Sequence, residues 1–334
     1  MTLTINTNIS SIIAQRNLDK ATAALNTSIE RMSTGYKINH ASDNAAGYSI
    51  SNMWVTQLGS LDIAAANAAT GADLLTTSEE TYSLLTSHLQ RVRDLTEQAA
   101  NGTYGTQSLR AIQSEVIARL QEINRISANA EFNGIWLMTG KGVGTAGLDL
   151  QVGLYASAAS QINLAQSLFA DASVGGLFST MTTGATGTTS FTDLMTAGGS
   201  SAANLSSEDA ATLATALEAF AAACAGMKYD GTKVVIQPTA GKKPAKDMLQ
   251  YIDAAINNIS DRVVKIGSAQ NRVESAIGAI DVQSQNLTSS LSTLRDTDVA
   301  TESSNYIQAQ ILQQASATLL STANQLPSIA LNLL

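Results

Sequence analysis

Apolar residues recur every seven positions along the C-terminal part of this chain. One row runs unbroken from Ile252 to Leu294, and a second row, set four residues later, is interrupted at Gln270 and Ser284. Two such rows are the a and d positions of a coiled-coil helix. At ~1.5 Å per residue the first row extends over roughly 63 Å, so the pattern predicts a rod-forming helix. The rows consist of Ile252, Ile259, Ile266, Val273, Ile280, Leu287 and Leu294, with Ile256, Val263, Ile277 and Leu291.

The N-terminal half contains helices that can pair with this rod. A row with the same spacing begins at Trp54 and reaches Leu89, and Asn101-Gly102 marks the expected end of that helix. A second helix is predicted from about Gln107 to Ala130, and Asn133-Gly134 follows it. The apolar positions of the two helices are Trp54, Leu61, Ala68, Leu75, Tyr82 and Leu89, then Leu109, Ile112, Val116, Ile123 and Ile126.

The two extreme ends repeat the seven-residue spacing and are almost uncharged. The first charged side chain is Arg16, and the 32 residues from Ser303 to Leu334 contain no Asp, Glu, Lys or Arg. A helix in water normally carries charge on its outer face, and isolated helices of modest propensity are marginal. We therefore expect each end to be disordered alone and to become ordered when several copies assemble. The positions expected to pack there are Leu18, Leu25, Ile29, Met32, Ile311, Leu312, Leu319 and Leu326.

The middle of the chain differs in kind. Leu148, Leu150 and Val152 alternate with polar residues, which predicts a strand whose hairpin partner is at 162–164. Residues 173–203 are rich in Gly, Ser and Thr, which is typical of irregular surface. Beyond them we expect a short helix over 206–224 and one more strand over 234–236.

These patterns are nested, because the two ends match each other and the next segments inward match as well. They predict a mainly α fold: a long antiparallel helical rod or coiled coil formed by both chain ends, with a β-hairpin and a small α+β insertion in the middle. The expected domains are 1–42 with 297–334, then 43–172 with 245–296, and finally 173–244.

Composition narrows the function. Charged residues are 14% of the chain, the net charge is −8, and Lys and Arg form no cluster, which argues against nucleic acid as a partner. No apolar run approaches the ~18 residues of a membrane span, and the first residues lack the features of a secretory signal. One cysteine and two distant histidines predict neither a disulfide nor a metal site. We therefore expect no cofactor, no membrane insertion and no catalysis.

Several segments, in order and at both ends, resemble bacterial flagellin, the subunit of the flagellar filament. The resemblance covers about 1–140 and 245–334, and residues 173–244 match nothing that we can name. The segments that carry it are Ile5–Asn8, Ile29–Gly35, Asn39–Gly47, Leu89–Leu95, Glu131–Gly134, Gln270–Arg272, Asp298–Glu302 and Ala309–Ala315.

The resemblance implies an architecture and a set of partners. In flagellins the paired ends form an inner coiled-coil tube, the next helices form an outer tube with a β-hairpin, here Leu148–Leu164, and the middle projects outward. Subunits leave the cell unfolded through the flagellar type III export channel, which explains the missing signal and implies an extracellular location. The implied partners are other copies of the chain, an export chaperone at the C-terminal helix, and filament cap and hook-junction proteins.

The resemblance also implies recognition of the monomer by Toll-like receptor 5. The positions that match the recognised surface are Gln90, Arg91 and Leu95 on one helix and Glu115 on the next, and all four are of the expected residue type. Asp94 stands where many relatives carry Glu. The alternative for Arg91 and Glu115 is that they are ordinary solvated or salt-bridged helix residues.

We therefore predict a structural subunit that polymerises into a flagellar filament for motility. A hook–filament junction protein, which shares the terminal helices, is the alternative within the family. A translocator or pore former would show a longer apolar stretch, and an enzyme would show convergent catalytic groups. Paired acids such as Glu79-Glu80 have no neighbouring histidine or cysteine in the sequence.

Overall fold

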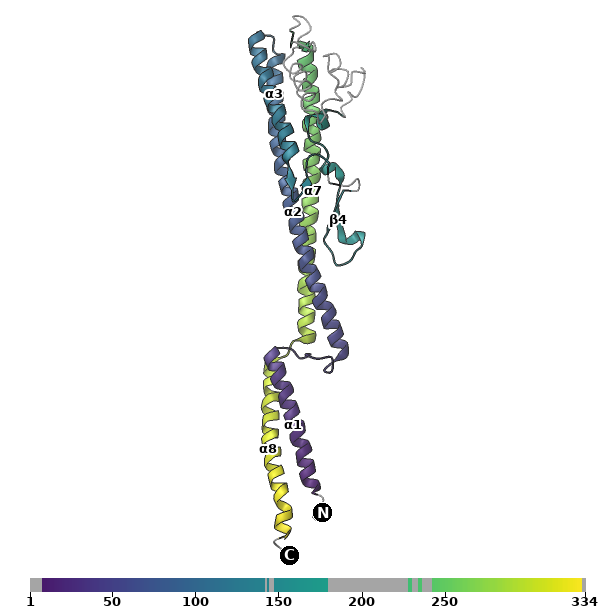
Figure 1. The fold of residues 1–334 in the computed structure, drawn as a ribbon, viewed down its shortest axis with the longest axis vertical. Helices are drawn as coiled ribbons and strands as arrows, with labels where there is room; N and C mark the ends of the chain where they lie inside the picture. Colours follow the sequence, from purple (N-terminus) through teal and green to yellow (C-terminus); the bar gives the residue numbers. More distant parts are fainter. Residues whose placement is uncertain are drawn as a thin grey trace. The chain divides into compact units, whose positions relative to one another are not determined.

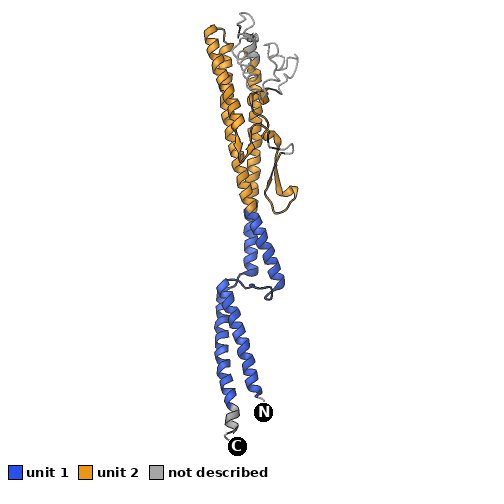
Figure 2. Cartoon of the chain, viewed as in Figure 1, with its two compact units in different colours: residues 1–62, 281–334 blue, residues 63–280 orange. Residues whose placement is uncertain are grey.

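The computed structural model describes residues 8–331 apart from 142, 144–146, 180–227, 230–233 and 236–241. The chain forms two compact units: residues 1–62 with 281–334, and residues 63–280 (Figure 2). Two helices, α2 (Ala45–Ala100) and α7 (Lys242–Arg295), contribute residues to both units. The fold is mainly helical, as predicted, with short antiparallel strand pairs in the middle of the chain (Figure 1).

The larger unit is built on the predicted seven-residue rows. In α7 the residues from Ile252 to Ile280 in the first row are at most 5% exposed, and in α2 those from Ala68 to Leu89 are fully buried. The two helices run antiparallel, since Arg93 pairs with Asp253 and Glu79 accepts from Gln270. Gln270 interrupts the apolar row because its amide bonds the Glu79 carboxylate at 2.9 Å.

The third helix, α3 (Thr106–Asn129), lies beside α2 and presents its predicted apolar side to the core. Leu120 belongs to the same buried row. Beyond α3, Asn133 and Gly134 have φ of 51° and 83°. They form the two-residue turn between β1 (Glu131–Phe132) and β2 (Ile135–Trp136). Asn-Gly is the usual sequence of such a left-handed turn, so it connects a small hairpin as well as ending the helical region.

The predicted hairpin in the middle of the chain is present. Strands β3 (Leu148–Gln151) and β4 (Gln161–Leu164) pair antiparallel, with Leu148 opposite Leu164. The hairpin packs on α2 at Gly71, where an added Cβ would lie 2.5 Å from a Leu150 methyl carbon. A side chain at this position would therefore displace the hairpin. Short 3-10 turns, η1 (Ala158–Ser160) and η2 (Gln166–Leu168), flank β4.

The start of the predicted irregular segment is helical instead. Residues Val174–Ser179 form α4, and Val174, Leu177 and Phe178 are fully buried. The correction has a simple cause, because apolar residues at i, i+3 and i+4 bury one face of even a short helix. The predicted strand at 234–236 appears as β6 (Val234–Val235), paired with β5 (Lys228–Tyr229). The helix predicted over 206–224 lies outside the described residues.

A buried arginine holds the segment before α4 against the helices. Arg262 of α7 donates to the carbonyl oxygens of Ala170 and Asp171 at 2.8 and 3.3 Å. The Tyr82 hydroxyl of α2 donates to the Leu168 carbonyl at 2.8 Å, and burial raises the pKa of this hydroxyl. The carbonyls of Leu168, Ala170 and Asp171 thus obtain partners from α2 and α7, as backbone carbonyls shielded from water require.

The smaller unit contains α1 (Ile9–Thr34) and α8 (Val299–Leu331), which lie side by side. The predicted domain boundaries after residues 42 and 296 fall in the two segments that connect α1 to α2 and α7 to α8. The compact units divide the chain further along, within α2 and α7. The predicted three-part division therefore stays a prediction.

The Arg262 contacts lead to a first prediction. Arg262→Met keeps the aliphatic stem but removes the donors, so unfolding of the larger unit should become easier by about 2–4 kcal/mol, the cost of charged hydrogen bonds lost from buried carbonyls. Urea unfolding followed by circular dichroism measures the loss, and amide exchange of residues 168–178 should accelerate. Arg272→Met, at an exposed position of the same helix, is the matched control. Equal stability of the two variants would contradict the assignment.

Candidate assembly interface on the terminal helices

Small residues form the contact between the two terminal helices. On α1 the buried positions are Ala14, Ala21 and Ser28, and on α8 they include Ala309, Ser316 and Ala323. Both rows have a spacing of seven residues and every member is at most 8% exposed. Small side chains let the helix backbones approach closely, so this pair gains contact area without large apolar residues. A search for large apolar residues alone misses this seam.

Polar contacts along the seam define its direction. Asn8 caps α1 by accepting from the Ser11 amide and also donates to the Ala323 carbonyl at 2.6 Å. Further along, Gln313 donates to the Thr22 hydroxyl at 3.2 Å. At the other end of the pair Arg31 and Glu302 form an ion pair. The residue numbers fall on one helix as they rise on the other, so α1 and α8 are antiparallel.

Large apolar side chains are left on the outside of this pair. Of the twenty exposed large hydrophobic residues among those described, ten lie on α1 and α8. Of the predicted packing positions, Leu18 and Leu25 are half-buried, whereas the Leu326 side chain lies outside the described residues. The exposed ones are Ile29, Met32, Ile311, Leu312 and Leu319 from the predicted set, with Ile9, Ile12, Ile13, Val299 and Ile307.

The exposed surface of α8 contains no charged side chain that would offset its apolar residues in water. The one charged residue of α8, Glu302, is 5% exposed because it faces α1. An open groove of about 720 Å³ runs along the pair, and Leu312 and Leu319 line it together with Ala24 and Lys20. Exposed apolar residues gathered on two paired helices in this way mark an interaction site. The surface is therefore the candidate site of assembly.

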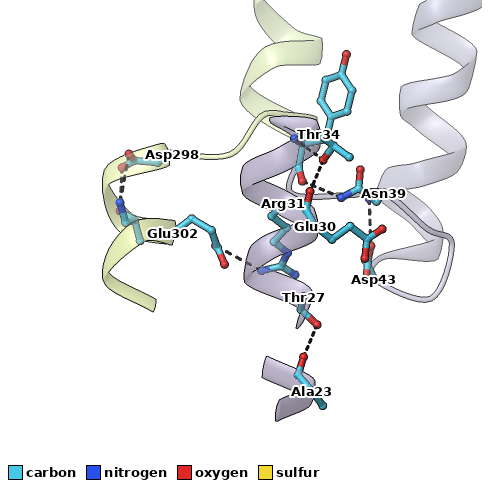
Figure 3. A network of polar contacts seen from close by, with 11 residues as sticks. Ala23, Thr27, Glu30, Arg31, Thr34, Asn39, Asp43, Asp298 and Glu302 are labelled. Atoms are coloured by element: carbon cyan, nitrogen blue, oxygen red, sulfur yellow. Dashed lines mark hydrogen bonds and ion pairs between the residues drawn. The ribbon is translucent and has the colours of Figure 1, made fainter. Parts of the chain in front are cut away.

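The segments that connect the terminal helices to the rest of the chain are themselves paired (Figure 3). Gly35 ends α1 with φ of 76°, and its carbonyl accepts from the Thr297 amide. Tyr36 and Asp296 form an antiparallel bridge, and the Arg295 guanidinium lies 3.9 Å from the centre of the Tyr36 ring. The two connections thus form a short two-stranded ladder at the end of the pair.

The longer connection between α1 and α2 is closed by an aspartate. The carboxylate of Asp43 accepts from the backbone amides of His40 and Asn39, and these bonds hold the pKa of Asp43 below its ordinary value. The His40 ring contacts Glu30 of α1 at 2.8 Å. Asn44 then caps α2 through the Gly47 amide. These contacts indicate that His40 helps to hold the turn between α1 and α2 in place.

The positions predicted for receptor contact gather where α2 and α3 meet. The Arg91 guanidinium of α2 pairs with the Glu115 carboxylate of α3 at 2.9 Å. Gln90 and Arg91 are exposed and Glu115 is partly exposed. Leu95 is 2% exposed, so its side chain is buried and not available at the surface. The structure thus brings Arg91 and Glu115 into contact, and Gln90 is exposed next to Arg91 in the sequence.

Among the described residues, no helix is long and apolar enough to cross a membrane, and no cluster of histidine, cysteine or acidic residues has the makings of a metal site. These findings apply to the described part of the chain only.

Comparisons with known proteins agree with the helical layout at both ends. The family model for the bacterial flagellin N-terminal helical region matches residues 5–142, and that for the C-terminal helical region matches 249–334. Polar flagellin F of Vibrio parahaemolyticus, flagellin A of Vibrio anguillarum and flagellin B of Vibrio cholerae are each 32% identical to this chain, with all of both chains covered. A solved structure of FliC from Burkholderia pseudomallei covers 60% of the chain at 21% identity, with a TM-score of 0.37. The chain therefore belongs to the bacterial flagellin family, whose members are structural subunits of the extracellular flagellar filament and not enzymes.

Proposed function

We propose that the exposed apolar residues of α1 and α8 form the contacts through which this subunit polymerises into a flagellar filament for motility. The observation that carries the proposal is that half of the exposed large apolar residues in the described part of the chain lie on these two helices. Each such side chain gains roughly 1 kcal/mol when its exposed remainder is buried. Neighbouring copies provide the matching surface, because every subunit presents the same face.

The same face explains why assembly and ordering of the ends are coupled. The pair relies on small residues for its internal contact, so little large apolar area is buried between α1 and α8 in a single chain. The ordering of both helices has an entropic cost that this limited burial offsets poorly. Burial of Ile307, Ile311 and Leu319 against neighbours supplies the missing stabilisation. The terminal helices therefore become fully ordered in the filament.

We also infer the partners that act before assembly. A cytosolic chaperone that covers α8 would keep its uncharged apolar face from premature contact with other copies, and the chain would then pass unfolded through the flagellar type III export channel. At the growing filament it would meet cap and hook-junction proteins. The support is the 32-residue stretch without charge from Ser303 to Leu334.

The face that contains Arg91 and Glu115 supports recognition of the monomer by Toll-like receptor 5. Gln90 precedes Arg91 on α2 and is exposed, whereas Leu95 is buried. A salt bridge between neighbouring helices fixes both side chains in one geometry, which reduces the ordering cost on binding. We propose that this pre-organised pair is the receptor contact.

A hook–filament junction role is the alternative within the family. A junction protein would join a filament end without forming filaments itself. Electron microscopy of the purified protein after salt-induced assembly separates the two roles, because a chain that never forms filaments, even with seeds, would favour the junction role.

The first prediction from this proposal concerns Leu319, which is 63% exposed. Leu319→Asp should leave expression and helix content unchanged but abolish filaments, because burial of a carboxylate among apolar side chains is strongly unfavourable. Leu319→Asn, which has nearly the same shape without the charge, should reduce filament yield and not abolish it. Sedimentation and electron microscopy measure both yields. Normal filaments from the Asp variant would refute burial of this position.

A second prediction concerns order at the ends. Amide exchange of the soluble monomer should be fast over α1 and α8 and slow over the residues of α2 and α7 that line the larger unit. In assembled filaments the exchange of α1 and α8 should slow by orders of magnitude. This is expected because helices that open locally in the monomer become buried between neighbouring subunits. Strong protection of both terminal helices in the dilute monomer would contradict the coupling.

A third prediction concerns the receptor. Arg91→Ala and Glu115→Ala should each lower the potency of the monomer in a Toll-like receptor 5 reporter assay by about tenfold or more, the usual effect of removing a central charged contact. Arg125→Ala is the matched control, since it breaks an exposed ion pair with Glu122 at 2.6 Å on α3. If all three variants are equally potent, the contact lies elsewhere.

A further inference from the structure

The seam between α1 and α8 does not define a unique register by shape. Ala14, Ala21 and Ser28 on one helix and Ala309, Ser316 and Ala323 on the other are repeated at the same seven-residue interval. A slip of α8 by seven residues would again place small residues against small residues. Each slip moves one helix by about 10 Å along the other. Repeating seams of this kind need a distinct residue to select one alignment.

One charged pair on the seam is not repeated. Arg31 and Glu302 face each other across the end of the pair, with a nitrogen–oxygen distance of 3.8 Å (Figure 3). The Glu302 side chain is 7% exposed, and Glu302 is the one charged residue of α8. A slip by seven residues in one direction would place Ala24 opposite Glu302, and a slip in the other direction would carry Glu302 beyond the end of α1 at Thr34. In both slipped alignments the Glu302 carboxylate, which is 7% exposed, loses the Arg31 guanidinium, and this loss is unfavourable.

The nearby ladder supports this alignment but is less specific. Its hydrogen bonds run between backbone atoms, from the Thr297 amide to the Gly35 carbonyl and from the Lys37 amide to the Arg295 carbonyl. Backbone atoms are the same at every residue, so such a ladder can re-form after a slip. The ring contact of Tyr36 with Arg295 adds a side-chain preference. The ion pair of the buried Glu302 carboxylate with Arg31, whose side chain is 30% exposed, carries the larger discrimination, because the wrong register separates the two charges.

We propose that Arg31 and Glu302 are the positioning residues that set the register of α1 against α8, and so determine which apolar side chains lie side by side on the assembly face. The proposal rests on the assembly function and refines it. In the native register Ile12 and Ile13 of α1 lie near the α8 residues that follow Leu319, because Ser11 bonds Asn324. A slipped pair would present a different combination of residues to neighbouring subunits.

Cysteine cross-linking of the soluble full chain tests the register directly, in a Cys224→Ser background. Oxidation traps the alignment in which α1 and α8 meet, even though the pair opens transiently in the monomer. Thr22→Cys with Gln313→Cys reports the native alignment, since these side chains are 3.2 Å apart. Thr22→Cys with Tyr306→Cys, and Thr22→Cys with Leu320→Cys, report slips by seven residues in each direction. Oxidation joins the two thiols of one chain with loss of two electrons and two protons to an added oxidant. The intrachain product is separated by gel mobility.

With Arg31 and Glu302 present, the native pair should cross-link and the slipped pairs should not. The neutral double variant Arg31→Met/Glu302→Gln should raise the slipped products about tenfold relative to the native one, as expected for loss of a coupled pair. The exchanged variant Arg31→Glu/Glu302→Arg should restore the native pattern. Arg16→Met, which removes an exposed charge from α1, is the control and should leave the pattern unchanged.

Two results would overturn the proposal. One is an unchanged cross-link pattern in the neutral double variant, which would mean that the ladder or the seam alone sets the register. The other is failure of the exchanged variant to recover the native cross-link, which would mean that the residues act through something other than their pairing. Filament yield is measured separately on the same proteins, so a correct register with no filaments would count against the assembly face and not against the register assignment.

Discussion

The close antiparallel contact between segments at opposite ends of the sequence is the constraint on which the rest of this molecule depends. Asn8 bonds the carbonyl of Ala323, and Arg93 pairs with Asp253 deeper in the chain. The helices α1 and α2 of the N-terminal half thus find partners in α8 and α7 of the C-terminal half. A single helix buries too little apolar surface to be stable alone in water. Pairing across the chain is therefore the condition for any ordered structure.

The two units satisfy this condition with different side chains. In the larger unit long apolar rows fill the core, and polar groups such as Gln270 and Arg262 are buried only with specific partners. In the terminal pair, alanine and serine form the internal contact and the large residues face outward. The first arrangement is typical of a self-sufficient core. The second leaves apolar surface for other copies, as a filament subunit requires.

Much of the fold can be predicted from the spacing of apolar residues in the sequence. The features that this spacing does not predict have physical causes. The rows from Ile252 and from Leu61 determine α7 and α2, because a seven-residue repeat leaves few alternatives. The contacts of Arg262 with the Ala170 and Asp171 carbonyls had no sequence signal, since backbone acceptors look alike everywhere. The small-residue seam was visible as a repeat, but alanine is common in any helix. Burial of Leu95 depends on the exact rotation of α2, which spacing determines only to within a residue.

The pairing of α1 with α8 has a consequence in time. The bond from Asn8 to Ala323 joins residues 315 apart in the sequence. A ribosome makes about 5–20 residues per second, so α1 exists for roughly 15–65 s before its partner is complete. During this interval α1 has no complete α8 to pair with in its own chain, so the assembly face cannot form. The order of synthesis thus creates an interval in which α1 has been made but no complete subunit exists. This interval ends only when the last residues of α8 have been made.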